Sequence, residues 1–178
     1  NAPLEAEANP GLSPNPTMAP WYFAGIQELL LHFHPLFAVM VIPLVVLAGL
    51  SLLPYLRYDG DTAGVWFCSD CGRKMSLVAV IVALIVTPLG ILADEYIIDF
   101  VVWLPSIPPV LSNGLIPAAL AMASMIGFYW LMKKKYTATN NETIQAVFVL
   151  LLVAFIILTV TCVWFRGSGM ALMWPWEV

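Results

Sequence analysis

Residues 143–165 decide the fold class: Thr143-Ile-Gln-Ala-Val-Phe-Val-Leu-Leu-Leu-Val-Ala-Phe-Ile-Ile-Leu-Thr-Val-Thr-Cys-Val-Trp-Phe165 contains no Asp, Glu, Lys or Arg. A helix of about 20 apolar residues is long enough to cross the hydrocarbon core of a bilayer, which is about 30 Å thick. A single run of this kind also suits the buried central helix of a soluble protein. The rest of the chain has to decide between the two.

Further apolar runs cover 35–56, 75–93 and 115–132, and the first is expected to continue a helix that begins near Phe23, giving one helix over 23–56. Hydrophobic residues make up 61% of the chain and charged residues 10%, whereas soluble domains carry about 25% charged residues. Four such runs in succession predict an all-α integral membrane protein with four transmembrane helices.

Most of the basic residues fall in two connecting segments, 57–74 and 133–142. They are Arg57, Arg73, Lys74, Lys133, Lys134 and Lys135. Basic loops stay on the cytoplasmic side of a membrane. We therefore expect 1–22, 94–114 and 166–178 to face the periplasm of a bacterial inner membrane. No basic stripe suggests a nucleic-acid partner.

The segments on the expected outer side are not simple loops. Residues 1–22 contain several prolines, which favours an extended arm over a helix. Residues 95–112 form a short amphipathic stretch that prolines then interrupt, and we expect it to lie along the outer surface. We find no internal repeat, and the first residues do not have the pattern of a signal peptide.

Three phrases precede the first helix: Ala2-Pro-Leu-Glu-Ala6, Ala8-Asn-Pro10 and Asn15-Pro-Thr-Met-Ala-Pro-Trp-Tyr-Phe23. Together they resemble the cytochrome b family, in which an Asn-Pro phrase precedes a Pro-Glu-Trp-Tyr motif and a long helix follows at once. The resemblance is close over residues 1–56 and extends to the order and topology of the later spans. The part resembled is the C-terminal half of cytochrome b, which is a separate chain called subunit IV in cytochrome b6f-type complexes.

The resemblance implies a subunit of a respiratory or photosynthetic Rieske/cytochrome b complex. Such a subunit forms part of the outer quinol-oxidation (Qo) site, where quinol reduces a Rieske 2Fe-2S protein and a b haem and releases protons outside. The implied partners are a haem-binding N-terminal cytochrome b subunit, the Rieske protein and a c-type cytochrome, in a dimeric complex that contacts lipid and quinone. The b haems and the cluster belong to these partners, so we expect no cofactor on this chain and no activity from it alone.

The motif departs from the family at Pro20, which replaces the glutamate that the family is thought to use to accept a proton from quinol. By resemblance, Pro20, Trp21 and Tyr22 shape the quinol pocket, and Tyr22 also donates a hydrogen bond. Glu28 and His32 are four residues apart and share a helix face, so they are the candidates to take the proton. We expect apolar surroundings to raise the pKa of Glu28 and His32 to titrate near neutrality. The alternative is a solvated pair at the level of the headgroups.

The chain has two histidines, His32 and His34. The haems of this family need histidines on two different helices, so we expect no haem ligand here. Cys68 and Cys71 form a Cys-x-x-Cys pair, which suits half of a zinc or iron–sulfur site or a redox dithiol. The other ligands are absent, so we expect a reduced pair of loop thiols and no metal site.

Two outer features leave alternatives open. Asp94, Glu95 and Asp99 form a solvated loop, a docking edge for a cytochrome c, or a proton exit. The fourth span and the tail with Trp174 and Trp176 extend beyond the family pattern. The rival function is a non-catalytic membrane anchor or assembly subunit of an electron-transfer complex, which the missing glutamate favours. A transporter fragment fits less well, because the spans lack charged residues and internal symmetry.

Overall fold

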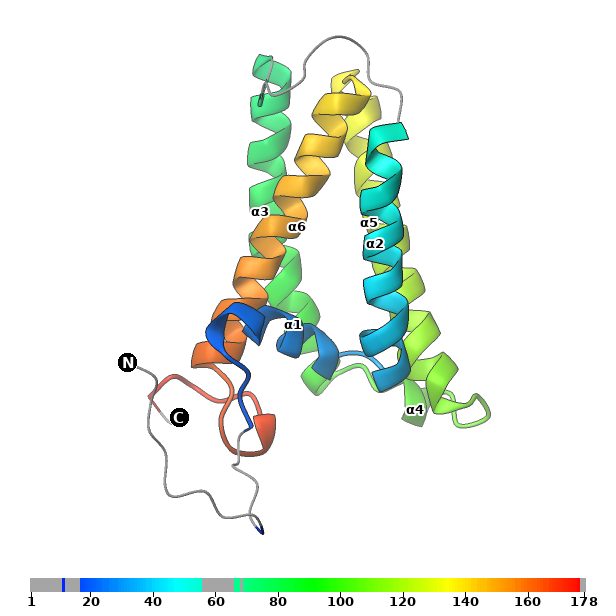
Figure 1. The fold of residues 1–178 in the computed structure, drawn as a ribbon, viewed down its shortest axis with the longest axis vertical. Helices are drawn as coiled ribbons and strands as arrows, with labels where there is room; N and C mark the ends of the chain where they lie inside the picture. The colour runs from blue at the N-terminus through cyan, green and yellow to red at the C-terminus, as the bar shows by residue number, and fades with distance from the viewer. Residues whose placement is uncertain (1–10, 12–16, 56–65, 68, 177–178) are drawn as a thin grey trace.

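The computed structural model describes residues 11, 17–55, 66–67 and 69–176, and these residues form helices and no strand. Four helices are long and apolar enough to cross a membrane: Phe37–Tyr55, Asp70–Tyr96, Leu111–Tyr136 and Asn140–Trp164. They contain the helices labelled α2, α3, α5 and α6 in Figure 1. The all-α fold with four candidate spans, predicted from the sequence, is confirmed.

The longest helices, α3 (Asp70–Tyr96) and α6 (Asn140–Trp164), pack side by side (Figure 1). The buried face of α3 carries small residues three or four positions apart: Gly72, Ser76, Ala79 and Ala83. Small residues at this spacing let two helix backbones approach closely inside a membrane. α5 (Ile116–Tyr136) adds Phe128 and Met132 to the same core.

Helix α2 (Ile42–Leu52) has no buried residue. Its side chains Leu44, Leu47 and Leu50 are 63%, 62% and 60% exposed. In water this exposure would cost roughly 25 cal/mol for each Å² of apolar surface, whereas lipid is itself apolar. The outer surface of the spans is therefore suited to lipid or to apolar partner helices.

The first span does not begin near Phe23. Helix α1 covers Trp21–Leu31, and the chain then breaks before a π-helical turn, η1 (Phe37–Val41), leads into α2. Pro35 explains the break, because it has no N–H to donate to the carbonyl of Leu31 and it disfavours a helical conformation at His34. The expected continuous helix over 23–56 is thus two helices, and α1 lies across one end of the spans (Figure 1).

A second π-helical turn, η3 (Leu111–Leu115), precedes α5. Each turn comes just before a proline, Pro43 or Pro117, whose missing N–H removes one hydrogen bond from the helix. Pro117 would otherwise donate to the carbonyl of Asn113, which instead accepts the backbone N–H of His34 at 2.9 Å. This hydrogen bond connects the break after α1 to the start of α5. The same Pro-x7-Pro spacing occurs over 35–43 and 109–117, so the chain contains a short repeated pattern where none was expected.

We call the end of the bundle that carries α1 the α1 end, and the opposite end the lysine end. Residues 133–135 lie in the last turn of α5 and not in a loop, and only Thr137, Ala138 and Thr139 connect α5 to α6. Lysines are favourable at a helix C-terminus, and Thr139 begins α6 with a capping box to Glu142. Glu142 also pairs with Ser69, the N-cap of α3, so one carboxylate joins two helix starts.

Several expectations fall on residues that the structure does not describe. These include most of the arm 1–22, Arg57 and Cys68. The outer segment over 94–114 contains one short helix, α4 (Phe100–Trp103), capped by the carboxylate of Asp99. Its position along a membrane surface stays a prediction.

Candidate functional site

The described part of the motif leads directly into α1. Pro20 is the N-cap of the helix, and Trp21 and Tyr22 form its first turn with exposed fractions of 74% and 62%. Pro20, Trp21 and Tyr22 therefore lie on the surface of this chain.

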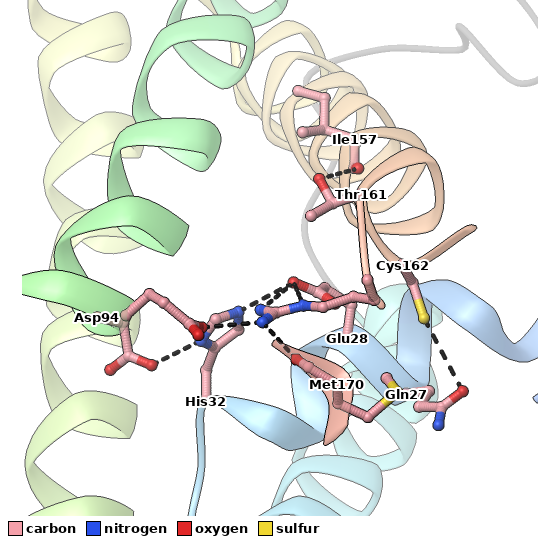
Figure 2. Close-up of polar contacts among 10 residues, drawn as sticks. Gln27, Glu28, His32, Asp94, Ile157, Thr161, Cys162 and Met170 are labelled. Carbon is pink, nitrogen blue, oxygen red and sulfur yellow. Dashed lines mark hydrogen bonds and ion pairs between the residues drawn. The ribbon is translucent and has the colours of Figure 1, made fainter. Parts of the chain in front are cut away.

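Gln27 fixes the residues that precede the motif. Its Oε1 accepts the backbone N–H of Ala19 at 2.6 Å, and its Nε2 donates to the carbonyl of Thr17 at 2.7 Å. The side-chain amide of Gln27 thus accepts one hydrogen bond from the backbone of residues 17–19 and donates another to it, as the backbone of an adjacent β-strand would. The thiol of Cys162, on α6, contacts the same Oε1 at 3.9 Å, and Figure 2 shows this contact.

The buried face of α1 consists of Ala24, Gly25 and Glu28, which lie against α6. A Cβ atom at position 25 would overlap Thr159 and Phe155 of α6. Gly25 therefore lets α1 approach α6 closely enough to bury Glu28 completely. This finding excludes the alternative of a solvated Glu28–His32 pair.

Glu28 is bound by Arg166, the second residue after α6. The Arg166 Nε lies 3.2 and 3.0 Å from the two carboxylate oxygens, and Nη2 lies 2.8 Å from Oε1. The Arg166 side chain is 2% exposed. A buried carboxylate needs a partner of this kind, because an unpaired charge away from water is very costly.

The third nitrogen of the guanidinium, Nη1, contacts two further segments of the chain. Arg166 Nη1 lies 2.9 Å from Oε2 of Glu95, at the end of α3, and donates to the carbonyl of Met170 at 2.8 Å. Residues 166 and 172 also form an isolated bridge that closes the turn after α6. Arg166 therefore binds α1, α3 and the C-terminal segment at one point.

His32 lies between Asp94 and Glu28 (Figure 2). Its Nδ1 is 2.6 Å from Asp94 Oδ2, and its Nε2 is 3.4 Å from Glu28 Oε1. Nε2 is buried, and its contact with Glu28 is too poorly aligned to count as a hydrogen bond. The imidazole still connects a fully buried carboxylate to one whose side chain is 36% exposed.

The protonation of this pair differs from the expectation. Burial raises the pKa of Glu28, but contacts with His32 and Arg166 outweigh it, so the pKa lies below its ordinary value. The predicted rise in the pKa of Glu28 is therefore wrong, because the apolar pocket also contains an arginine. Burial lowers the pKa of His32, but Asp94 and Glu28 raise it to about 9. The ring is an imidazolium at neutral pH.

The acidic cluster is more ordered than a solvated loop. Asp94 binds His32, Glu95 binds Arg166, and Asp99 accepts the N–H groups of Val101 and Val102. Glu28, His32, Asp94, Glu95 and Arg166 form what we call the ionic cluster. With His32 charged, it has one more negative than positive charge.

The described residues contain no group of three His, Cys, Asp or Glu side chains that could hold a metal ion. His34 lies apart from the ionic cluster: its Nδ1 accepts the N–H of Leu36 at 3.3 Å. Cys71 contacts the carbonyl of Tyr136 and the sulfur of Met75, and Cys68 lies outside the described residues.

Sequence reasoning brought Glu28 and His32 together but missed Arg166 and Gln27. Arg166 carried one signal, because it is the single basic residue on the acidic side of the chain. No sequence signal pointed to a structural role for Gln27, since a glutamine on a helix is usually a solvated residue.

Comparisons of the chain with protein-family models, with curated proteins and with solved structures gave no match.

Proposed function

We propose that this chain is the C-terminal cytochrome b subunit of a Rieske/cytochrome b complex in a bacterial inner membrane. In this role it forms part of the outer quinol-oxidation site, and the α1 end with the arm and tail faces the periplasm. Its partners are a haem-binding cytochrome b subunit, a Rieske protein and a c-type cytochrome, and quinol is the substrate. The phrase Asn15–Phe23, with its resemblance to the cytochrome b motif, carries this proposal.

The position of the motif supports the proposal. Pro20, Trp21 and Tyr22 stand at the start of α1, at the end of the spans, and are open to a second subunit. A quinol-oxidation site between two chains needs such an incomplete wall. The basic residues Arg73, Lys74 and 133–135 lie at the opposite, lysine end, which agrees with a cytoplasmic location for that end.

The ionic cluster offers a path for the proton. Glu28 lies 3.4 Å from Nε2 of His32 and Asp94 lies 2.6 Å from Nδ1. Once the ring has released a proton towards the partly exposed Asp94, a rotation that aligns an unprotonated ring nitrogen with Glu28 lets it take the next proton from that carboxyl. A general base of this kind works through direct hydrogen bonds or one water. Because the pKa of His32 is about 9, release from the ring limits the path at neutral pH and becomes easier as the pH rises.

A non-catalytic anchor or assembly subunit is the second candidate. Two observations favour it: Pro20 cannot accept a proton, and Arg166 holds Glu28 in an ion pair that weakens it as a base. In that case the ionic cluster serves only to fix α1, α3 and the C-terminal segment to one another.

Purification from native membranes through an affinity tag on this chain separates the two candidates. The proposal predicts that b-type haem and a Rieske cluster copurify and that the preparation reduces a c-type cytochrome when quinol is added. The chain isolated from its partners should show no haem absorbance. Copurification of redox subunits that turn over equally well after this chain is removed would favour the anchor.

A further inference from the structure

One face of α5 near the lysine end is exposed. The buried residues of this helix are Phe128 and Met132, which are four positions apart and share one face. Trp130 lies midway between them in the sequence, on the opposite side of the helix, and is 63% exposed. Gly127 and Lys134 are three and four residues from Trp130, so they share its face. We call Gly127, Trp130 and Lys134 the outer face of α5.

Gly127 leaves a notch in this face. A Cβ atom at position 127 would meet no other atom within 4 Å, whereas the equivalent space at Gly114 is taken by the ring of Phe37. Gly49 and Gly90 are equally open, but neither is followed on its helix by a tryptophan and then a basic residue. The notch at Gly127 is therefore open to whatever surrounds the span.

Lys134 differs from the two lysines beside it. Lys133 donates to Asn140 and lies over the ring of Tyr129, and Lys135 lies over the ring of Tyr136. Lys134 is exposed and makes no such contact with any residue that the structure describes. Its ammonium group is therefore free to bind an anion from outside the chain, and a phosphate is a common partner of lysine.

The order of the three residues along α5 matches the order of the chemical groups in a phospholipid. The third span ends at Tyr136, so Lys134 lies where the hydrocarbon region would meet the headgroups. Tryptophan is enriched at this level of a membrane, because one edge of its ring is polar and the rest is apolar. Gly127 lies seven residues before Lys134, about 10 Å deeper in the membrane, at the depth of the acyl chains.

The charge around Lys134 favours an anion. The segments at the lysine end contain six basic residues and four acidic ones, and the acidic ones are Asp59, Asp61, Asp70 and Glu142. Glu142 is buried and holds the starts of α3 and α6 together. The lysine end is therefore positive overall, and basic residues at the surface of a membrane attract anionic lipids.

We propose that the outer face of α5 binds an anionic phospholipid such as phosphatidylglycerol. Lys134 binds the phosphate, Trp130 packs beside the glycerol and ester groups, and one acyl chain fills the notch at Gly127. Phosphatidylcholine has a positive group that compensates its phosphate, so the positive lysine end attracts it less. This site does not depend on the proposed function or on the orientation of the chain.

The test uses the full-length chain in nanodiscs that contain equal amounts of phosphatidylglycerol and phosphatidylcholine. Native mass spectrometry measures which lipid the chain retains. We expect the wild type to prefer phosphatidylglycerol and Lys134→Gln to lower this preference about fivefold, the effect of one basic residue near an anionic surface. Lys74→Gln removes the same charge from an exposed position on α3 at the same end, and it should keep most of the preference.

A second pair of variants tests the notch without a change of charge. Gly127→Leu should lower the retention of phosphatidylglycerol several-fold, and Gly49→Leu, at an equally open position on α2, should leave it unchanged. Leucine favours a helix more than glycine does, so neither variant should disturb the fold. Equal retention of both lipids by the wild type would overturn the proposal. A loss in Lys74→Gln as large as in Lys134→Gln would also overturn it, because the attraction would then come from the whole lysine end.

Discussion

Arg166 and Glu28 form a buried ion pair in which Nη2 lies 2.8 Å from Oε1, and this contact joins residues 138 positions apart. It connects the segment after the fourth span to the helix that carries the Ala19-Pro20-Trp21-Tyr22 motif. The fourth span and the tail, for which the family resemblance supplied no role, therefore have one: they place Arg166 against α1 and α3.

Replacement of Arg166 by methionine should destabilise the protein strongly. The change leaves Glu28 buried without a partner, which typically costs about 3–5 kcal/mol. Thermal unfolding of the detergent-solubilised protein, followed by helical circular dichroism, measures the loss. Lys134→Met, an exposed basic residue in α5, should change little. The double variant Glu28→Gln/Arg166→Met should recover part of the stability, and a double variant as unstable as Arg166→Met would contradict the ion-pair explanation.

Stability should fall as the pH rises from about 6.5 to above 9. The pKa of His32 is raised to about 9 by Asp94 and Glu28, so the protonated ring stabilises the fold fully below its ordinary pKa of about 6.5. That contribution disappears as the pH passes about 9. Because Asp94 is partly exposed, we expect about 1–3 kcal/mol and not the full value of the shift.

The difference between wild type and His32→Gln isolates this contribution from other titrating groups. Glu28, Asp94 and Arg166 are the same in both proteins, so the imidazole ring at position 32 is the only difference between them. The stability difference between them should shrink between pH 6.5 and 9. A difference that is constant over this range would show that the ring is not charged in the folded protein.

Gln27→Ala should loosen the chain in front of the motif. Gln27 accepts the backbone N–H of Ala19, and a single hydrogen bond contributes about 0.5–1.5 kcal/mol. Hydrogen exchange at the Ala19 amide should therefore accelerate by about 2- to 10-fold. Gln145→Ala, at the lysine end, is the matched control and should leave this amide unchanged. Equal exchange in both variants would mean that the motif is held by other contacts.

Cysteine labelling tests the orientation of the chain in its membrane. An impermeant maleimide should not react with Cys68 or Cys71 in intact cells, because we place the lysine end in the cytoplasm. A cysteine introduced by Trp176→Cys, at the exposed α1 end, should react without permeabilisation. Cys162 is buried and should stay unreactive in both cases. The reverse pattern would invert the topology.

Hydrophobicity was sufficient to predict the spans, because each is a long run of apolar residues and the composition excludes a soluble core. Because apolar residues continue from α1 into the first span, hydrophobicity alone did not reveal the break after α1. Pro35 marked that break, but its effect depends on whether neighbouring groups satisfy the freed carbonyls, and this is a property of the packed structure.

The ionic cluster was predictable in part. Glu28 and His32 share a helix face, and a four-residue spacing reveals this from sequence alone. The partners Asp94, Glu95 and Arg166 come from other helices, and no local rule links them to α1. The direction of the pKa shift of Glu28 depends on Arg166, so the sequence predicted that Glu28 and His32 lie close together but not the ionisation of the carboxylate.

The most direct test of the account is the rate of quinol-driven cytochrome c reduction by the complex purified through this chain, in wild type and in Glu28→Gln. Glu142→Gln serves as the control, because it removes a buried carboxylate at the lysine end. The account predicts that Glu28→Gln lowers turnover by about 10- to 100-fold at equal haem content, the effect of losing a positioned base. Wild-type turnover should rise between pH 7 and 9. Normal turnover of Glu28→Gln across pH 6 to 8 would contradict the account and show that the proton leaves through another subunit.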